Sequence, residues 1–146
     1  MARGDLVVFE EAGLALLNGT HDLDTDTIRC ALITTLPTAA QATPTLGDFT
    51  EVSGSGYTAG GETLTISLTE TGGVTTFDST ANPSWTQNGS GPTNIVAALV
   101  YNDTAAGDDA ICFVDMTVDD GTTAISLQDG DISITWNASG LFTLTV

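Results

Sequence analysis

The hydrophobic residues of this chain recur mainly at every second position, in short runs that polar turns separate. Within residues 62–69 (ETLTISLT), Leu64, Ile66 and Leu68 alternate with threonine or serine. This period of two predicts a half-buried strand, because successive side chains of a strand point to opposite faces of a sheet. Residues 27–34 (TIRCALIT) carry apolar side chains on both faces, so they predict a central strand that is covered on both sides.

The longest apolar runs lie in the second half of the chain. Residues 94–101 (NIVAALVY) and 110–118 (AICFVDMTV) are joined by the polar residues 102–109 and predict a hairpin in the core. Glycine-rich and Asn/Asp-rich turns delimit the shorter runs. These runs predict further short strands at residues 74–77, 123–127, 131–136 and 141–146.

Only one segment has the features of a helix. Residues 10–18 contain good helix formers, and Gly19 stands where a helix would end. Residues 36–61 are rich in Pro, Thr, Gly and Ser, have weak periodicity and predict a long surface excursion. The sequence therefore predicts a single domain, residues 1–146, with an all-β fold. We expect an antiparallel, jelly-roll-like β-sandwich of about eight strands, with one short N-terminal helix and a short N-terminal arm at residues 1–8.

The charge of the chain narrows the classes of partner. Nineteen Asp and Glu residues face only two basic ones, Arg3 and Arg29, which gives a formal net charge of −17. Phosphate binding draws on Lys and Arg, so we expect no nucleic-acid partner, and an anionic membrane surface would repel the chain. The acidity favours either solubility or complementarity to a basic patch on a protein partner. A hydrophobic share of 41% indicates a folded chain.

The N-terminal residues and the cysteines bear on where the protein is made. The apolar stretches near Met1 are short and interrupted by acidic residues, unlike a signal peptide, so we expect synthesis in a cytoplasm. Cys30 and Cys112 both lie in apolar runs, where cysteine usually behaves as a small buried hydrophobe. The sequence leaves open whether they form a disulfide.

The chain offers few candidates for metal binding or catalysis. His21 is the only histidine and reads as an exposed loop residue, without the orienting partner that a catalytic base needs. Asp22, Asp24 and Asp26 alternate like the first ligands of a calcium loop, but Thr27 stands where such a loop needs glycine. These aspartates are more typical of a solvated strand entry, and a weak calcium site is the alternative.

Acidic pairs and aromatic residues are the remaining candidates. The pairs Asp119–Asp120 and Asp129–Asp131 adjoin glycines and favour turns over the two carboxylates of a glycosidase. Four large aromatic side chains could stack on a sugar or fill a core. They are Tyr57, Trp85, Tyr101 and Trp136. The sequence therefore predicts that the protein is not an enzyme, and we assign no catalytic, cofactor-binding or metal-binding residue.

Three phrases of the sequence resemble a family of small structural proteins of tailed bacteriophages. They are LALLNGTHDLDTDTIRCALIT (residues 14–34), GYTAGGETL (residues 56–64) and LQDGDISITWNASGLFTLTV (residues 127–146). The resemblance covers most of the chain in the same order. It implies a capsid decoration, or cement, protein that acts without cofactors, forms a homotrimer and binds the major capsid protein on the outer surface of the shell.

This implied role has specific structural expectations. A cement protein would have buried tryptophans, a flat or lobed base, and an N-terminal arm at residues 1–8 that is free to reach a neighbour. The alternative is a tail, neck or head-fibre component that recognises host glycans, which would have a shallow groove lined by exposed Trp or Tyr. A small carbohydrate-active enzyme is a third class, which the turn-like acidic pairs disfavour.

Overall fold

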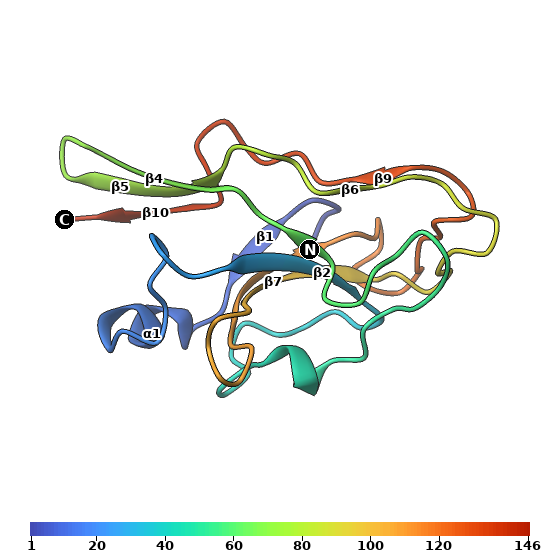
Figure 1. Cartoon of the computed structure of the whole chain (residues 1–146), viewed down its shortest axis with the longest axis horizontal. Helices are drawn as coiled ribbons and strands as arrows, with labels where there is room; N and C mark the ends of the chain where they lie inside the picture. Colours follow the sequence, from blue (N-terminus) through green and yellow to red (C-terminus); the bar gives the residue numbers. More distant parts are fainter.

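A computed structural model describes the whole chain, Met1–Val146, and confirms an all-β fold of antiparallel sheets. The large sheet has the strand order β1-β8-β7-β2-β3 (Figure 1). Its strands are β1 (Leu6–Val8), β2 (Ile28–Ile33), β3 (Glu62–Thr63), β7 (Ala97–Asn102) and β8 (Ala110–Asp115). Every residue of β7 and β8 is buried, and the two strands pair directly, so the predicted core hairpin is confirmed. Strand β2 lies inside the sheet, as its two apolar faces predict.

A second layer lies over one face of the large sheet (Figure 1). It consists of a three-stranded sheet, order β10-β5-β4, and a two-stranded sheet, β6-β9. These strands are β4 (Ile66–Thr71), β5 (Val74–Ser79), β6 (Ser84–Trp85), β9 (Ile132–Ser133) and β10 (Phe142–Thr145). The larger core cluster joins both layers, through residues such as Cys30, Val100, Phe77 and Ile132. Because the second layer is split into two small sheets, the jelly-roll sandwich stays a prediction.

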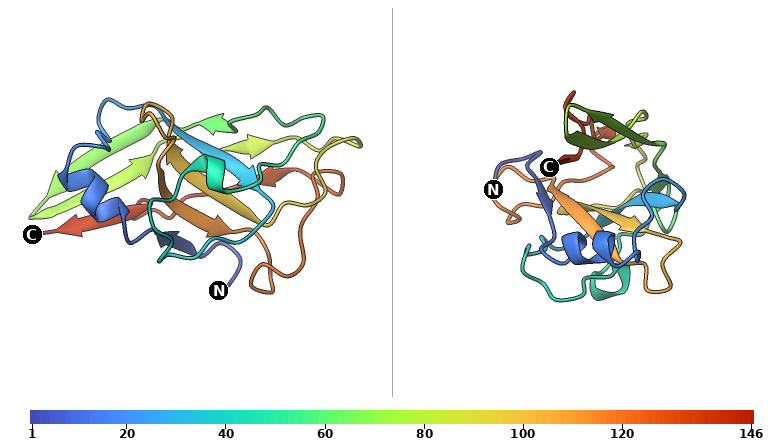
Figure 2. Two further views of the ribbon diagram at one scale, coloured as in Figure 1. Left: turned by 90° about the horizontal axis from the view of Figure 1, so that it is seen from below. Right: turned by 90° about the vertical axis from the view of Figure 1, so that its left-hand side faces the viewer.

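The opposite face of the large sheet is covered by non-strand segments (Figure 2). Helix α1 (Ala12–Leu17) and the segment containing the short helix η1 (Leu46–Asp48) lie against it. Phe9 packs on Phe113 with ring centroids 5.2 Å apart and on Phe49 at 6.4 Å. The helix confirms the prediction at residues 10–18. The predicted excursion at residues 36–61 thus also covers a second hydrophobic core. The weak periodicity of this segment does not predict that contact.

Three segments differ in the structure from what their sequence predicts. The N-terminal arm is wrong as a free segment, because β1 pairs with β8 and the amino group of Met1 lies 2.9 Å from Asp120 Oδ1. Residues 123–127 form no strand and contribute only a bridge between Ile125 and Ile95. Residues 62–69 divide between β3 and β4, which belong to different sheets. In each case a long-range pairing overrides the local pattern.

The glycine-rich segment at residues 56–64 is held by a hydrogen-bond network around Glu51. Tyr57 donates its hydroxyl hydrogen to Glu51 Oε1 (2.5 Å), and the main-chain N–H of Gly60 donates to the same oxygen (2.6 Å). Arg29 donates to the carbonyl oxygens of Gly60 (2.9 Å) and Gly61 (2.8 Å). Burial, together with the hydrogen bond to Glu51, raises the pKa of Tyr57 and keeps it a donor. The network ties this segment to the central strand β2.

The two cysteines are free and buried in the middle of the large sheet. Val100 of β7 is the register partner of both Cys30 and Cys112, so the cysteines are two strand spacings apart. That separation is about 9.5 Å, whereas a disulfide needs Cα atoms within about 7 Å. Burial raises the pKa of the Cys30 thiol to about 12 and also raises the pKa of Cys112. The geometry excludes a disulfide between them in this fold.

We therefore expect both thiols to be inert in the native protein at neutral pH, because the reactive form is the thiolate and the strands exclude reagents. A colorimetric thiol reagent should find no reactive group before denaturation and both Cys30 and Cys112 after it. Rapid labelling of the native chain would contradict the closed packing of β2, β7 and β8.

Candidate interaction surface

The only histidine lies in a buried polar cluster and not on an exposed loop, so that expectation is wrong. His21 is 4% exposed, and its Nδ1 lies 3.3 Å from Nδ2 of Asn102. Asn102 donates from the same Nδ2 to Asp26 (2.6 Å), while its Oδ1 accepts from the N–H of Thr104 (2.9 Å). Nδ2 of Asn102 carries two hydrogens, and besides Asp26 both Nδ1 of His21 and the carbonyl oxygen of Thr20 (3.3 Å) lie within its reach. Nε2 of His21 is buried and has no hydrogen-bond partner.

The burial of His21 predicts a pH dependence of stability. Burial lowers the pKa of His21, although Asp109 and Asp26 act in the opposite direction. A lowered pKa in the folded state means that the contribution of His21 is present above the unfolded pKa of about 6.5 and is lost as the pH falls below it. We expect the stability advantage of the wild type over His21→Gln to shrink between about pH 7 and pH 5. Urea unfolding of both proteins at several pH values measures this difference in unfolding free energy. A difference that does not change with pH would refute the lowered pKa of His21.

The acidic candidates accept hydrogen bonds from both neighbouring and distant segments of the chain. Asp22 and Asp26 interact within their own loop, where Asp26 accepts from the main-chain N–H of Asp22 (2.9 Å). The side-chain hydroxyl of Thr123 and its main-chain N–H (2.7 Å) both donate to Asp119, and these hydrogen bonds lower the pKa of its carboxyl group. Asp131 accepts from the N–H of Gln87 (2.7 Å). No group of three or more His, Cys, Asp or Glu side chains is arranged to hold a metal ion.

The aromatic candidates do not form a common platform. Trp85 and Tyr101 are buried in the two cores, and Tyr57 lies against Trp85 with ring centroids 6.2 Å apart. Trp136 is partly buried, and its Nε1 donates to the carbonyl oxygen of Ala81 (3.2 Å). The structure thus brings Tyr57 and Trp85 together inside the protein and leaves Trp136 by itself.

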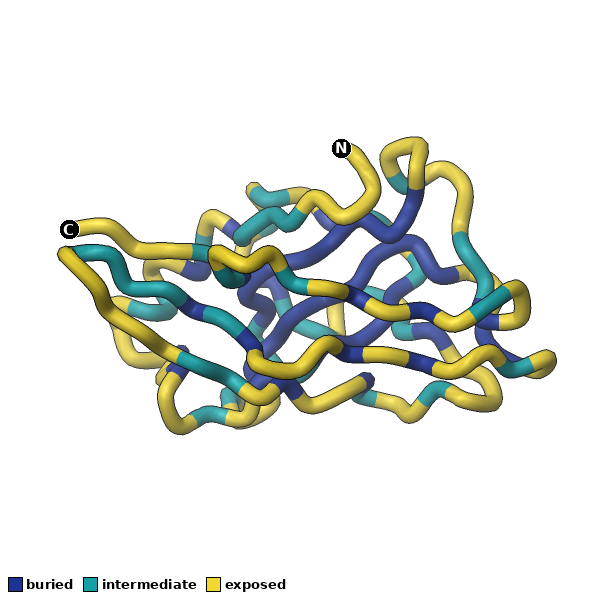
Figure 3. The backbone as a smooth tube through the Cα atoms, turned by 90° about the horizontal axis from the view of Figure 1, so that it is seen from above, coloured by how far each residue is buried: buried dark blue, intermediate teal, exposed yellow.

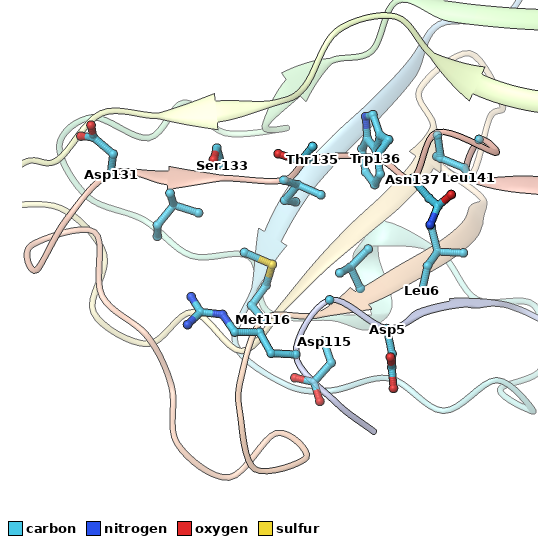
Figure 4. Close-up of a pocket in the computed structure, with 16 residues that line it drawn as sticks. Asp5, Leu6, Asp115, Met116, Asp131, Ser133, Thr135, Trp136, Asn137 and Leu141 are labelled. Atoms are coloured by element: carbon cyan, nitrogen blue, oxygen red, sulfur yellow. The ribbon is translucent and has the colours of Figure 1, made fainter.

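A groove lies along one side of the two layers (Figure 4). It has a volume of about 440 Å³ and lies between the N-terminal segment, the end of β8 and residues 131–137. Leu6 of β1 and Met116, which follows β8, line it, and Trp136 is its only aromatic residue. Asp5, at its rim, already accepts from the N–H of Ala2 (2.6 Å). Asp115 and Asp131 also line the groove, and the buried Oδ2 of Asp115 has no hydrogen-bond partner.

The most distinctive surface is at the end of the molecule where the three-stranded sheet extends past the ends of β2 and β7 (Figure 1). We call residues 68–77 and 142–146 the overhang. The register places Leu68 and Phe142 beside Phe77 on the face that continues into the core. Leu144 follows on the same face and is 59% exposed, and the last residue, Val146, is 96% exposed. Thr75 and Glu70 lie in the same row as Leu144, so the apolar part of this face consists of Leu68, Phe77, Phe142 and Leu144. Leu144 extends it beyond the layer that covers it.

The opposite face of the overhang is polar. Thr69, Thr76 and Thr143 form one row across the three strands on that face. Burial is concentrated in the middle of the molecule, while the overhang, apart from Phe77, is intermediate or exposed (Figure 3). An amphipathic sheet whose apolar face lacks a cover is typical of a surface that contacts another molecule.

Helix α1 exposes further apolar side chains at the same end of the molecule (Figures 1 and 2). Leu14 is 60% exposed and Leu17 is 89% exposed, whereas Ala12 is the only buried residue of the helix. Glu10 and Glu11 precede the helix, and Glu10 is exposed. The sequence pattern correctly predicts the helix but does not indicate that its leucines face solvent, since a leucine pair usually marks the buried side.

Comparison with protein-family models, with curated proteins and with solved structures finds no match to this chain. No helix of the structure has the length and apolar character that a membrane span requires. The assignment of function therefore rests on the chain's own surfaces and on the resemblance of its three phrases.

Proposed function

We propose that this protein is a structural component of a bacteriophage virion, a capsid decoration or cement protein that binds the outer surface of the major capsid shell and stabilises it. The observation that carries the proposal is the set of exposed apolar side chains at one end of an otherwise acidic molecule. The resemblance of three phrases in the same order supports the phage assignment. A homotrimer and a place on the capsid surface, after synthesis in the host cytoplasm, belong to this proposal.

Helix α1 is the surface that best suits contact with the shell. Leu14 and Leu17 supply apolar area, and the neighbouring Glu10 and Glu11 supply negative charge. Arg29 is engaged with the carbonyl oxygens of Gly60 and Gly61, so it is not available to a partner. Charge complementarity therefore favours a shell site with apolar side chains inside a basic rim.

The proposed mechanism is stabilisation by mass action. A protein that binds only the expanded shell lowers the free energy of that state, by about 2.7 kcal/mol per site at a free concentration one hundred times Kd. Multiplied over many sites, this gain opposes the outward pressure of packaged DNA. No chemical step is needed, which is consistent with a surface built from leucines and carboxylates.

The proposal predicts that purified protein binds expanded shells that lack it and occupies regular sites between capsomers. The double variant Leu14→Glu/Leu17→Glu should lose most of this binding, because it places charge in the apolar contact. Val118→Glu is the matched control, since Val118 is 74% exposed and lies in the loop after β8. Cosedimentation measures binding, and electron cryomicroscopy locates the sites.

A role in the tail, neck or head fibre with glycan recognition is the second candidate, and the groove beside Trp136 is the observation that favours it. In that case density would appear only at the tail or at a vertex, and Trp136→Ala would weaken binding to host glycans. Absence of the protein from every part of the virion would refute both candidates.

A further inference from the structure

The last strand of the chain has an unpaired edge. Strand β10 pairs with β5 on one side and with no strand on the other. Val146 donates its N–H to the carbonyl oxygen of Gly73 (2.9 Å). Because the bonding direction alternates along an antiparallel strand, the main-chain groups of Thr143 and Thr145 point away from β5. Such an edge is a template for another strand.

Apart from its short length of four residues, this edge lacks the features that normally protect an edge strand from pairing. Strand β10 contains no charged side chain, no proline and no bulge. Leu144, at its centre, is the exposed apolar residue described above. The only charged side chain of the whole overhang is Glu70, which lies on β4 at the opposite edge of the sheet.

The distribution of charge indicates which molecule covers β10. Two copies of a chain with a net charge of −17 repel each other over most of their surface. This repulsion is weakest at the β10 edge, because no acidic side chain lies on it. Pairing through β4 would instead bring the carboxylates of two Glu70 residues close together, which is unfavourable. The uncharged edge therefore suits a second copy, whereas a basic partner would gain nothing from it.

We propose that two copies of this protein associate through antiparallel pairing of their β10 strands about a two-fold axis at Leu144. Thr143 then exchanges main-chain hydrogen bonds with Thr145 of the partner subunit, and Leu144 faces the partner subunit's Leu144. The two three-stranded sheets become one continuous sheet whose apolar faces adjoin.

This contact does not involve the proposed shell-binding surface on α1, and it is an alternative to the homotrimer that belongs to the proposed function. A two-fold contact uses the same patch on both copies and closes at two chains. A trimer would need a head-to-tail contact between two different patches. The number of copies in solution therefore distinguishes the two arrangements.

The test is the mass of the purified full chain as a function of concentration, from sedimentation equilibrium and light scattering. The wild type should associate reversibly to twice the monomer mass of 14.9 kDa. Leu144→Glu should weaken the association by at least about tenfold, because two carboxylates would then face each other. Thr145→Pro should do the same, since it removes an outward N–H while leaving the pairing with β5 intact.

Leu17→Glu is the control that matches Leu144→Glu, because it changes an exposed leucine on α1, away from β10, and should leave the mass unchanged. Circular dichroism verifies that each variant is folded. In the wild type, amide exchange at Thr143 and Thr145 should slow as the concentration rises. A wild type that stays monomeric, a trimer, or a dimer that both β10 variants leave intact would each overturn the proposal.

Discussion

Replacing Gly61 by alanine is expected to destabilise the fold by at least about 3 kcal/mol, which can abolish folding of a marginally stable domain. Gly61 has a φ of +68°, a conformation that L-residues rarely adopt. A Cβ atom there would lie well inside contact distance of the carbonyl group of Cys30. That group belongs to the buried central strand β2, so neither side can move away at low cost.

The measurement is the urea unfolding midpoint, with the amount of folded protein as a second readout if Gly61→Ala does not accumulate. Gly13→Ala is the matched control, because Gly13 lies in helix α1 and a Cβ atom there would meet nothing within 4 Å. The free energy of unfolding of Gly13→Ala should be higher than that of the wild type by about 0.5–1 kcal/mol, the difference in helix propensity between alanine and glycine. A Gly61→Ala protein as stable as the wild type would contradict the close approach to β2.

Replacing Phe113 by alanine is the second large effect that we expect, a loss of about 3–5 kcal/mol. Phe113 is completely buried on the face of the large sheet that α1 and residues 36–50 cover. It packs against Phe9, directly before the helix, so truncation leaves a cavity under both covering segments. The same variant should weaken binding to the proposed shell site, because Leu14 and Leu17 would no longer be held in place.

Chemical unfolding of Phe113→Ala checks the stability, and Leu17→Ala is its control. Leu17 is almost fully exposed, so its truncation removes little buried surface and should change the unfolding free energy by less than about 0.5 kcal/mol. Equal effects of the two substitutions would mean that the second core is not the packed unit described here.

The two exposed apolar surfaces at this end of the molecule suit different partners. The overhang is nearly uncharged and suits a second copy of the chain, while α1 combines leucines with acidic neighbours and suits a basic partner. Variants of Leu144 should therefore change self-association, and variants of Leu14 and Leu17 should change shell binding. Observing these effects separately would assign the two contacts independently.

Much of the secondary structure could be predicted from the order of side chains alone. Apolar runs rich in branched residues predict the hairpin β7–β8 and the central strand β2, because these segments suit a buried, pleated sheet whatever surrounds them. The same reasoning predicts helix α1 from alanine, glutamate and a terminal glycine. The acidity, and the absence of any pattern typical of a catalytic site, likewise follow from the sequence.

The tertiary structure decided which segments meet, since that depends on contacts between residues far apart in the chain. His21 looks like a loop residue in the sequence but is buried because Asn102 lies beside it. The excursion at residues 36–61 has little periodicity, yet Phe49 packs on Phe9 and helps to cover the large sheet. The alternation around Leu68 predicts an apolar face, and only the lengths of the two layers determine that this face extends past its cover. The period of side chains indicates which face of a strand is apolar, but what lies against that face is a property of the whole fold.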